Sequence, residues 1–259
     1  MIKNLINDLY TYRQLLRSNI RKEIRGKYKG SFLGVLWSFV NPLLMTLVYA
    51  IVFPFILKGG QENYVTFLVI AILPWNWFTT VIAQGTNCVL VNAGIIKKVY
   101  FPREILPISV VTSGLVNYLI SCIIILLFLI FSGIGLSVYI LFLPIIVIIQ
   151  YMLSLGLILI SSSIDVYIRD AEYIINFFVM MLFYATPILY SSTMFPEKYR
   201  WIIDWNPMGT IITSYRDIFF YKRLPDLSRL GLVAIFSFII FYVGLAVFKK
   251  LQKGFAEEV

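Results

Sequence analysis

One very long stretch without a charged side chain constrains the fold of this chain most strongly. From Leu106 to Ile164, 59 consecutive residues include no Lys, Arg, Asp or Glu. A transmembrane helix needs about 20 apolar residues, so this stretch has room for two spans and a turn. We expect the turn at Phe131–Ser137, where two glycines interrupt the apolar run. The sequence therefore predicts an integral membrane protein.

The composition agrees with a membrane location, because 60% of the residues are apolar and only 14% are charged. The apolar runs are continuous and do not alternate with polar residues, which favours helices over a β-barrel. We expect an all-α integral membrane fold with six transmembrane helices, at Gly34–Leu57, Tyr64–Gln84, Leu106–Phe131, Val138–Ser163, Ile174–Tyr190 and Leu230–Phe248. The chain then divides into an N-terminal helix (1–33), a six-span domain (34–248) and a tail (249–259).

The distribution of basic residues predicts the orientation of these spans. Fifteen of the 22 Lys and Arg residues lie in the N-terminal segment, the second and fourth connections and the tail. Cytoplasmic segments of membrane proteins carry such an excess, so both termini are expected in the cytoplasm. A cleavable signal peptide is not expected, because the first apolar run follows a charged segment and is too long for one.

The residue inventory narrows the possible chemistry. The chain has no histidine, so we expect neither zinc chemistry nor histidine-based acid–base catalysis. Cys88 and Cys122 lie in or beside apolar segments, and we expect them to be small buried side chains instead of disulfide or metal ligands. No metal site and no nucleic-acid partner are expected.

A basic amphipathic helix is expected before the first span. Its arginines recur every four residues and form one stripe, and an apolar face lies beside them. Such a helix would lie in the membrane interface and attract anionic lipid. Alternatively, it is a solvated basic leader that only sets the topology. The stripe is Arg13, Arg17, Arg21 and Arg25, and the apolar face is Leu9, Tyr12, Leu16 and Ile20.

The second connection, Asn92–Ser109, carries charge between two apolar runs. Pro102 is expected to begin a new short helix. Val99, Tyr100 and Phe101 are expected to form an exposed apolar knob, which would suit a docking surface. Alternatively, its basic residues set topology and its aromatics anchor the interface. The candidate docking residues are Ile96, Lys97, Lys98, Tyr100, Phe101, Pro102, Arg103 and Glu104.

The fourth and fifth connections also break the apolar pattern. Salt-bridged packing is expected in the fourth, with a proton relay as the alternative; its charged residues are Asp165, Arg169, Asp170 and Glu172. The fifth connection predicts two short re-entrant helices that could close a pore from outside, or an interfacial lid without a gating role. Asn206 is expected to cap the second helix. The candidate gate residues are Pro196, Trp201, Trp205, Pro207 and Tyr215.

Aromatic residues make up 17% of the chain. Most are explained by lipid-facing and interface positions, although flat rings can also contact sugar faces along a path. The candidate channel aromatics are Trp37, Phe39, Tyr49, Phe177, Phe178 and Tyr184.

Four stretches of the chain resemble the transmembrane permease of ABC-type polysaccharide exporters, a family that includes O-antigen and teichoic acid permeases. These are "YKGSFLGVLWSFVNPLL", "ILPWNWF", "NAGIIKKVYFPREILP" and "DVYIRDAEY". The C-terminal "FKKLQKGFAEEV" is also similar to the ends of such permeases. The likeness covers nearly the whole chain.

The resemblance implies a homodimer in the bacterial inner membrane that pairs with two copies of a separate cytoplasmic ATPase. It implies that Asn92–Pro107 forms a coupling helix on the ATPase and that Phe195–Tyr221 forms outer gate helices. The substrate it implies is a lipid-linked glycan, moved to the outer leaflet past aromatics at the dimer interface. The chain lacks the phosphate-binding pattern G-x-x-x-x-G-K-[ST], so it is expected to bind no cofactor and to leave ATP and Mg²⁺ to the partner.

Two other classes of protein remain open on the residues alone. An ion-gradient-driven secondary transporter or flippase would usually show internal repeats and charged or broken helices near the midplane. A membrane enzyme acting on polyprenyl-linked sugars would need convergent acids or a metal site. The acid clusters around Asp170 and Asp217 are expected on opposite sides of the membrane, which argues against the enzyme.

Overall fold

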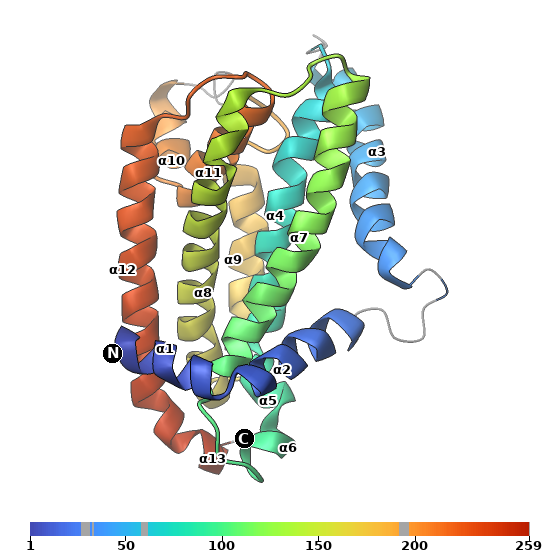
Figure 1. Ribbon diagram of the computed structural model, residues 1–259. Helices are drawn as coiled ribbons and strands as arrows, with labels where there is room; N and C mark the ends of the chain where they lie inside the picture. Colours follow the sequence, from blue (N-terminus) through green and yellow to red (C-terminus); the bar gives the residue numbers. More distant parts are fainter. Residues whose placement is uncertain (27–31, 33, 58–61, 192–196, 259) are drawn as a thin grey trace.

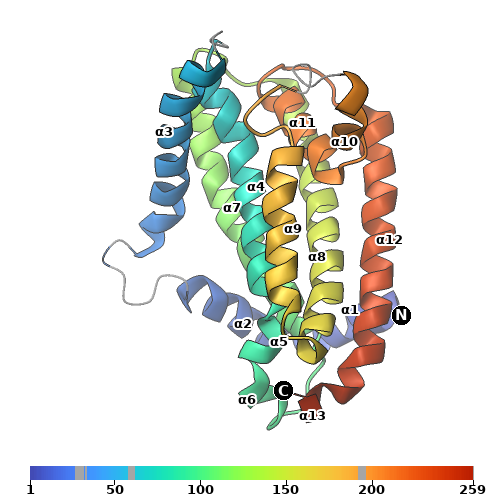
Figure 2. The same cartoon turned by 180° about the vertical axis from the view of Figure 1, so that it is seen from behind.

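The computed structural model describes residues 1–26, 32, 34–57, 62–191 and 197–258, and this part of the chain is helical without strands. Its longest helices run side by side as a bundle (Figures 1 and 2). They are α3 (Trp37–Leu57), α4 (Tyr64–Thr86), α7 (Ile105–Phe131), α8 (Leu143–Tyr167), α9 (Ala171–Ala185) and α12 (Leu227–Leu251). The all-α prediction is confirmed.

Shorter helices lie at the two ends of the bundle (Figure 1). Near the C-terminus lie α1 (Ile2–Thr11), α2 (Arg13–Gly26), α5 (Cys88–Val91), α6 (Ala93–Ile96) and α13 (Phe255–Glu258). At the opposite end lie α10 (Arg200–Asp204) and α11 (Pro207–Phe219). Single 3₁₀ turns are η1 (Gly34–Leu36), η2 (Val138–Phe142), η4 (Glu197–Tyr199) and η5 (Gln252–Gly254).

Four stretches of the described chain are long and apolar enough to cross a membrane: Tyr64–Thr86, Ile105–Phe131, Val138–Tyr167 and Leu227–Glu258. The turn predicted between the third and fourth spans is also present. The helix α7 ends at Phe131, and Gly133 and Gly135 follow with φ angles of 72° and 69°. This left-handed backbone suits glycine, so the two glycines account for the reversal.

The predicted fifth span, Ile174–Tyr190, is wrong at its end. The helix α9 has 15 residues and stops at Ala185, and Thr186 is extended with φ −104° and ψ 133°. Thr186 precedes Pro187, whose ring disfavours helical backbone at the preceding residue. The run of apolar residues therefore continues beyond the helix itself.

The helices α8 and α12 approach each other very closely. A Cβ atom added to Gly244 of α12 would lie 2.5 Å from the carbonyl oxygen of Gly156 in α8. One added to Gly156 would lie 2.6 Å from the backbone nitrogen of Phe241. Such small residues let helix backbones pack directly in membrane proteins, so these two glycines fix the α8–α12 pair.

A buried polar network joins α4, α8 and α11 inside the bundle. The side-chain amide of Gln150, which has no exposed surface, donates to the carbonyl of Pro74 at 2.8 Å. The Tyr215 hydroxyl donates to the Gln150 side-chain oxygen at 3.0 Å. The helix α4 runs through Pro74, from Tyr64 to Thr86, as one helix. Satisfied networks of this kind specify one packing arrangement.

Candidate functional site

The arginine stripe lies on the exposed side of α2, where Arg13, Arg17, Arg21 and Arg25 are all exposed. The predicted apolar face turns the other way, and Leu9, Tyr12 and Leu16 pack against the core. The expected single helix is broken near Tyr12 into α1 and α2.

The helix α2 is also tied to the corner between α5 and α6. The Lys22 ammonium donates to the side-chain oxygen of Asn92 at 2.8 Å. Asn92 is 5% exposed, and its side-chain nitrogen donates to the Cys88 carbonyl at 2.8 Å. Cys88 itself is a free, buried thiol, as the sequence predicted. This corner therefore joins the N-terminal segment to the second connection.

An exposed surface follows this corner, and we call it the α6 tip. Tyr100 has 91% of its surface exposed, far more than a packed tyrosine would. The basic pair Lys97 and Lys98 is also exposed. Apolar and basic side chains thus share one projecting surface, as expected for protein docking. The α6 tip consists of Val91, Ile95, Lys97, Lys98, Val99 and Tyr100.

The predicted docking residues are divided between this surface and the interior. Ile96, Phe101 and Glu104 are buried, and Phe101 is only 4% exposed. The expectation of an exposed knob that includes Phe101 is therefore wrong, because this ring belongs to the apolar core. Pro102 begins no separate short helix, since its turn leads directly into α7, where the Ile105 nitrogen donates to the Pro102 carbonyl at 3.2 Å.

The C-terminal tail holds the inner side of this segment. Arg103 donates from Nη1 to the carbonyl of Gln252, and the Gln252 side-chain nitrogen donates to a Glu104 carboxylate oxygen at 3.1 Å. The Arg103 guanidinium also lies 5.8 Å from the centre of the Phe255 ring. These contacts join the second connection to η5 and α13.

Phe255 anchors the tail. It has no exposed surface and lies 5.4 Å, centre to centre, from the ring of Phe248. The Tyr167 hydroxyl, at the end of α8, donates to the carbonyl of Leu251 at 2.8 Å. Sequence reasoning treated this region only as a cytoplasmic tail. An aromatic residue among the charges of "KKLQKGFAEEV" was the available signal for its docking.

The fourth connection is held by hydrogen bonds, and the prediction of salt bridges is wrong in the part of the chain that the structure describes. A carboxylate oxygen of Asp165 accepts from the backbone nitrogen of Glu172 at 3.2 Å. The Glu172 carboxylate accepts from the Asn87 side chain at 3.1 Å. Arg169 and Asp170 are exposed. Asp165 lies in α8, and one of its carboxylate oxygens reaches a free backbone N–H group in the first turn of α9, whereas its other oxygen is buried without a hydrogen-bond partner.

The candidate channel aromatics fall into separate groups. Phe177, Phe178 and Tyr184 are 57%, 59% and 66% exposed on α9. The rings of Tyr49 of α3 and Phe183 of α9 lie 6.4 Å apart, centre to centre, although α4 lies between these two helices in Figure 2. Trp37 lines a cavity between α3, α4 and α7 instead. Phe39 belongs to α3, and its side chain lies outside the described part of the structure.

At the opposite end, the predicted helix cap is confirmed. The Asn206 side-chain oxygen accepts from the Met208 backbone nitrogen at 3.0 Å, and Pro207 begins α11. Trp201 and Trp205 are 60% and 84% exposed. Among the other candidate gate residues, Tyr215 is fully buried in the core and Pro196 lies outside the described residues.

Arg216 of α11 is the most deeply buried basic residue in this region, with 2% of its surface exposed. It donates to the carbonyls of Pro187, of Ile188 at 2.5 Å and of Tyr190 at 3.2 Å. Its guanidinium carbon lies 3.4 Å from the centre of the Phe67 ring. Arg216 therefore fixes the segment after α9 to α11, a role that the sequence alone did not indicate.

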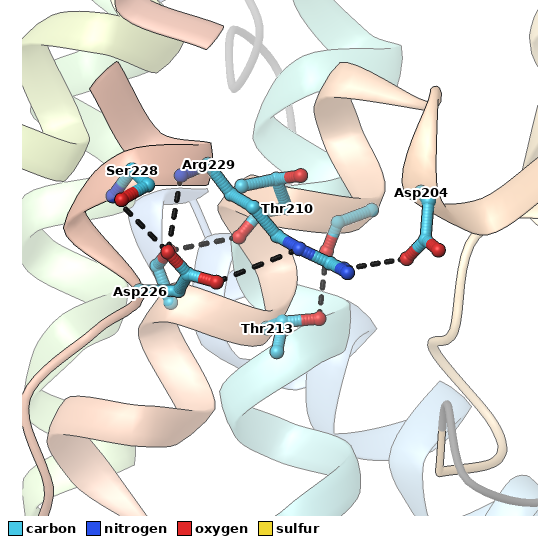
Figure 3. Close-up of polar contacts among 8 residues, drawn as sticks. Asp204, Thr210, Thr213, Asp226, Ser228 and Arg229 are labelled. Atoms are coloured by element: carbon cyan, nitrogen blue, oxygen red, sulfur yellow. Dashed lines mark hydrogen bonds and ion pairs between the residues drawn. The ribbon is translucent and has the colours of Figure 1, made fainter. Parts of the chain in front are cut away.

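A second basic residue organises the surface beside α11, as Figure 3 shows. The Arg229 guanidinium lies between two carboxylates, 2.5 Å from an Asp204 oxygen and 3.5 Å from an Asp226 oxygen. Asp226 also caps α12 by accepting from the backbone nitrogens of Ser228 and Arg229, both at 3.1 Å. Asp204, Asp226 and Arg229 border a cavity of about 260 Å³ between α10, α11 and α12.

The family model described as "ABC-2 type transporter" matches residues 14–220, from α2 through the end of α11. The chain belongs to the ABC-2 type transporter family. Together with its long apolar helices, this places the chain among membrane-embedded transporter proteins.

Relatives of this ABC-2 transporter chain align over most of their length. It is 37% identical over 225 residues to the "O-antigen export system permease protein RfbA" of Klebsiella pneumoniae, which covers 86% of each chain. It is 35% identical over 257 residues to the protein of the same name from Myxococcus xanthus, covering 98% of this chain and 99% of that one. The resemblance predicted from the sequence is confirmed.

Proposed function

We propose that this chain is the permease subunit of an ATP-driven exporter that moves a lipid-linked polysaccharide to the outer side of the bacterial inner membrane. The observation that carries the proposal is the alignment with an O-antigen export permease over 98% of this chain and 99% of that relative. O-antigen is the favoured glycan, with teichoic acid and capsule types as alternatives within the same mechanism.

In this proposal the energy comes from a separate cytoplasmic ATPase. The chain has no phosphate-cradling glycine-rich motif of its own, which is why the proposal includes a separate ATPase. Two copies of this ATPase would serve a homodimer of the chain. The α6 tip is the docking surface we assign to the ATPase, because it is exposed, basic and partly apolar. A push on this surface would bias the transporter between two states.

The membrane arrangement follows from the same proposal. Helices α3 and α9 complete six spans, with both termini in the cytoplasm and 249–259 as the tail. The exposed arginines of α2 suit contact with anionic lipid headgroups in the interface. The exposed aromatics of α9 would face the glycan at the dimer interface. Helices α10 and α11 would dip into the outer leaflet and gate the exit.

Depletion of the chain in its native host tests the export function. We expect the glycan to disappear from the cell surface while its lipid-linked form accumulates on the cytoplasmic side, measured by surface labelling and lipid extraction. Re-expression of the chain should restore the surface glycan only when the partner ATPase can hydrolyse ATP. Unchanged surface glycan would contradict the proposal. Export that persists without ATP and stops when the proton gradient collapses would establish the gradient-driven alternative.

A further inference from the structure

Two polar stripes on neighbouring helices face the same open space, and their residues range from buried Ser113 and Ser121 to exposed Gln84. Each stripe repeats every four residues, so each occupies one side of its helix. The first stripe, on α4, is Asn76, Thr80 and Gln84, and the second, on α7, is Ser113, Asn117 and Ser121. All six side chains border one cavity of about 490 Å³. Uncharged polar residues in transmembrane segments usually bond to a neighbouring helix, so two stripes around an open space need an explanation.

The cavity lies between α3, α4 and α7 and reaches α2 at the end of the bundle near the C-terminus. Asn41 of α3 and Glu23 of α2 complete its polar lining. Burial raises the pKa of the Glu23 carboxyl, and the charge of Lys22 partly offsets this. Known small-molecule sites have volumes of about 300–1,000 Å³, so this space is large enough for a small organic ligand.

Some buried polar atoms in the cavity wall have no hydrogen-bond partner. The indole N–H of Trp77 is unpaired although this residue is only 4% exposed, and the side-chain oxygen of Asn117 is unpaired as well. The serine hydroxyls donate to their own helices, Ser113 to Val110 at 2.8 Å and Ser121 to the Asn117 carbonyl at 2.9 Å. Their oxygens can still accept. Leaving a buried polar group unpaired costs about 1–3 kcal/mol, which a suitable ligand would recover.

The lining selects the chemical class of the ligand. Glu23 is the charged group among the described lining residues, and it would repel a phosphate or carboxylate. A bare cation cannot accept from the Trp77 N–H, which is a donor only. Aromatic surface is also present, since Trp37 lines the cavity and the rings of Trp77 and Tyr118 stack 5.0 Å apart. Donors, acceptors and flat apolar faces together suit an uncharged, polyhydroxylated ring.

We propose that this cavity binds one uncharged sugar unit. The site lies within a single protomer, and it is separate from the exposed aromatics of α9. The inference rests on the proposed export function for its biological meaning, because it identifies a point where the permease would hold a glycan. Binding itself requires neither ATP nor the partner, so it can be measured independently of export.

Photocrosslinking of the full-length chain in phosphatidylcholine nanodiscs tests the site. The probe is an octyl glucoside that carries a diazirine on its sugar, and the labelled residues are mapped by mass spectrometry. We expect labels on α4 and α7 at the cavity. Competition by soluble maltotetraose would indicate a sugar that enters from solution, whereas competition by unlabelled octyl glucoside alone would indicate a sugar presented by a membrane lipid. Either pattern supports the site.

Adjacent threonines of α4 provide a matched pair of variants. Thr80 lines the cavity, whereas Thr79 is partly buried outside it and donates to its own helix at 3.3 Å. We expect Thr80→Val combined with Asn117→Leu to reduce labelling at least tenfold, and Thr79→Val to leave it unchanged. Equal labelling in both, or equal labelling by a diazirine phosphatidylcholine without sugar, would overturn the proposal. Loss of sugar binding with intact ATPase association would leave the proposed function standing.

Discussion

The two ends of the bundle each use an arginine that bonds to main-chain carbonyls, but they use it differently. Arg216 is buried and holds three carbonyls in the segment after α9. Arg103 is only half-buried and holds one carbonyl, that of Gln252. Neither arginine forms an ion pair within the described residues. At one end, therefore, a buried arginine holds the segment after α9 in place. At the other end, Arg103 holds only the inner side of the second connection, and the outer side of that connection stays exposed.

The largest effect is expected from removing Arg216. In the Arg216→Met variant the three carbonyls lose their donor, and each unpaired buried acceptor costs about 1–3 kcal/mol, so we expect a loss of about 3 kcal/mol or more. The free energy of unfolding in detergent, measured by denaturant titration, reports this loss. Arg200→Met is the matched control, because Arg200 lies nearby in α10 at the partly exposed surface. Equal stability of the two variants would contradict the role of Arg216.

The next largest effect concerns the α8–α12 pair, which connects the two ends. Gly244→Ala would place a methyl group 2.5 Å from the Gly156 carbonyl oxygen. Overpacking of this kind costs about 1–3 kcal/mol. Gly231→Ala on the same helix meets nothing within 4 Å and is the control, expected to be neutral or slightly stabilising. The thermal unfolding midpoints of both variants measure the difference, and a drop in the control as large as in Gly244→Ala would refute the packing argument.

A smaller effect is expected at Arg103. The Arg103→Met variant loses a partly exposed hydrogen bond, so we expect a global cost of only about 1 kcal/mol. The loss of local order in the tail should be larger than the loss of global stability, because Arg103 links the tail to the second connection. Hydrogen–deuterium exchange should accelerate in residues 252–258 and remain unchanged in α11. Unchanged exchange in the tail would show that its other contacts, including those of Phe255 and Tyr167, hold it without Arg103.

The smallest effect on stability is expected at the α6 tip. Tyr100 is 91% exposed, so Tyr100→Ala should change the free energy of unfolding by no more than about 0.5 kcal/mol. Phe101→Ala on the inner side should cost about 3 kcal/mol or more, because it opens a cavity in the core. Denaturant titrations of the two variants separate the surfaces. Similar losses in both would mean that Tyr100 is packed in the native protein.

The features that sequence reasoning predicted correctly are local ones. The turn at Gly133 and Gly135, the cap at Asn206 and the positions of most long helices depend on neighbouring residues and continuous apolar runs. The end of α9 was also local, since Thr186 precedes a proline, but the apolar run concealed it. The four-residue spacing of the α2 arginines correctly predicted that they share one exposed side of the helix.

The rest depended on which distant elements meet. Nothing near Phe101 in the sequence shows that its ring is buried. The carbonyl partners of Arg216 lie 26 to 29 residues earlier in the chain. The polar stripes of α4 and α7 were visible as four-residue repeats, yet only packing brings Trp77 and Asn117 to the same cavity. Hydrogen bonds also replaced the ion pairs expected around Asp165.

The proposed mechanism depends on binding of a separate ATPase to the α6 tip, and co-purification can detect this binding. Tagged chain is recovered in mild detergent from its native host, and the associated proteins and ATPase activity are measured for the wild type and for a Lys97→Glu, Tyr100→Ala double variant. Gln14→Ala, at an exposed position of α2, is the control. We predict a stoichiometric ATPase with the wild type and the control, and its loss in the double variant without a loss of stability. Undiminished ATPase binding by the double variant would contradict the claim.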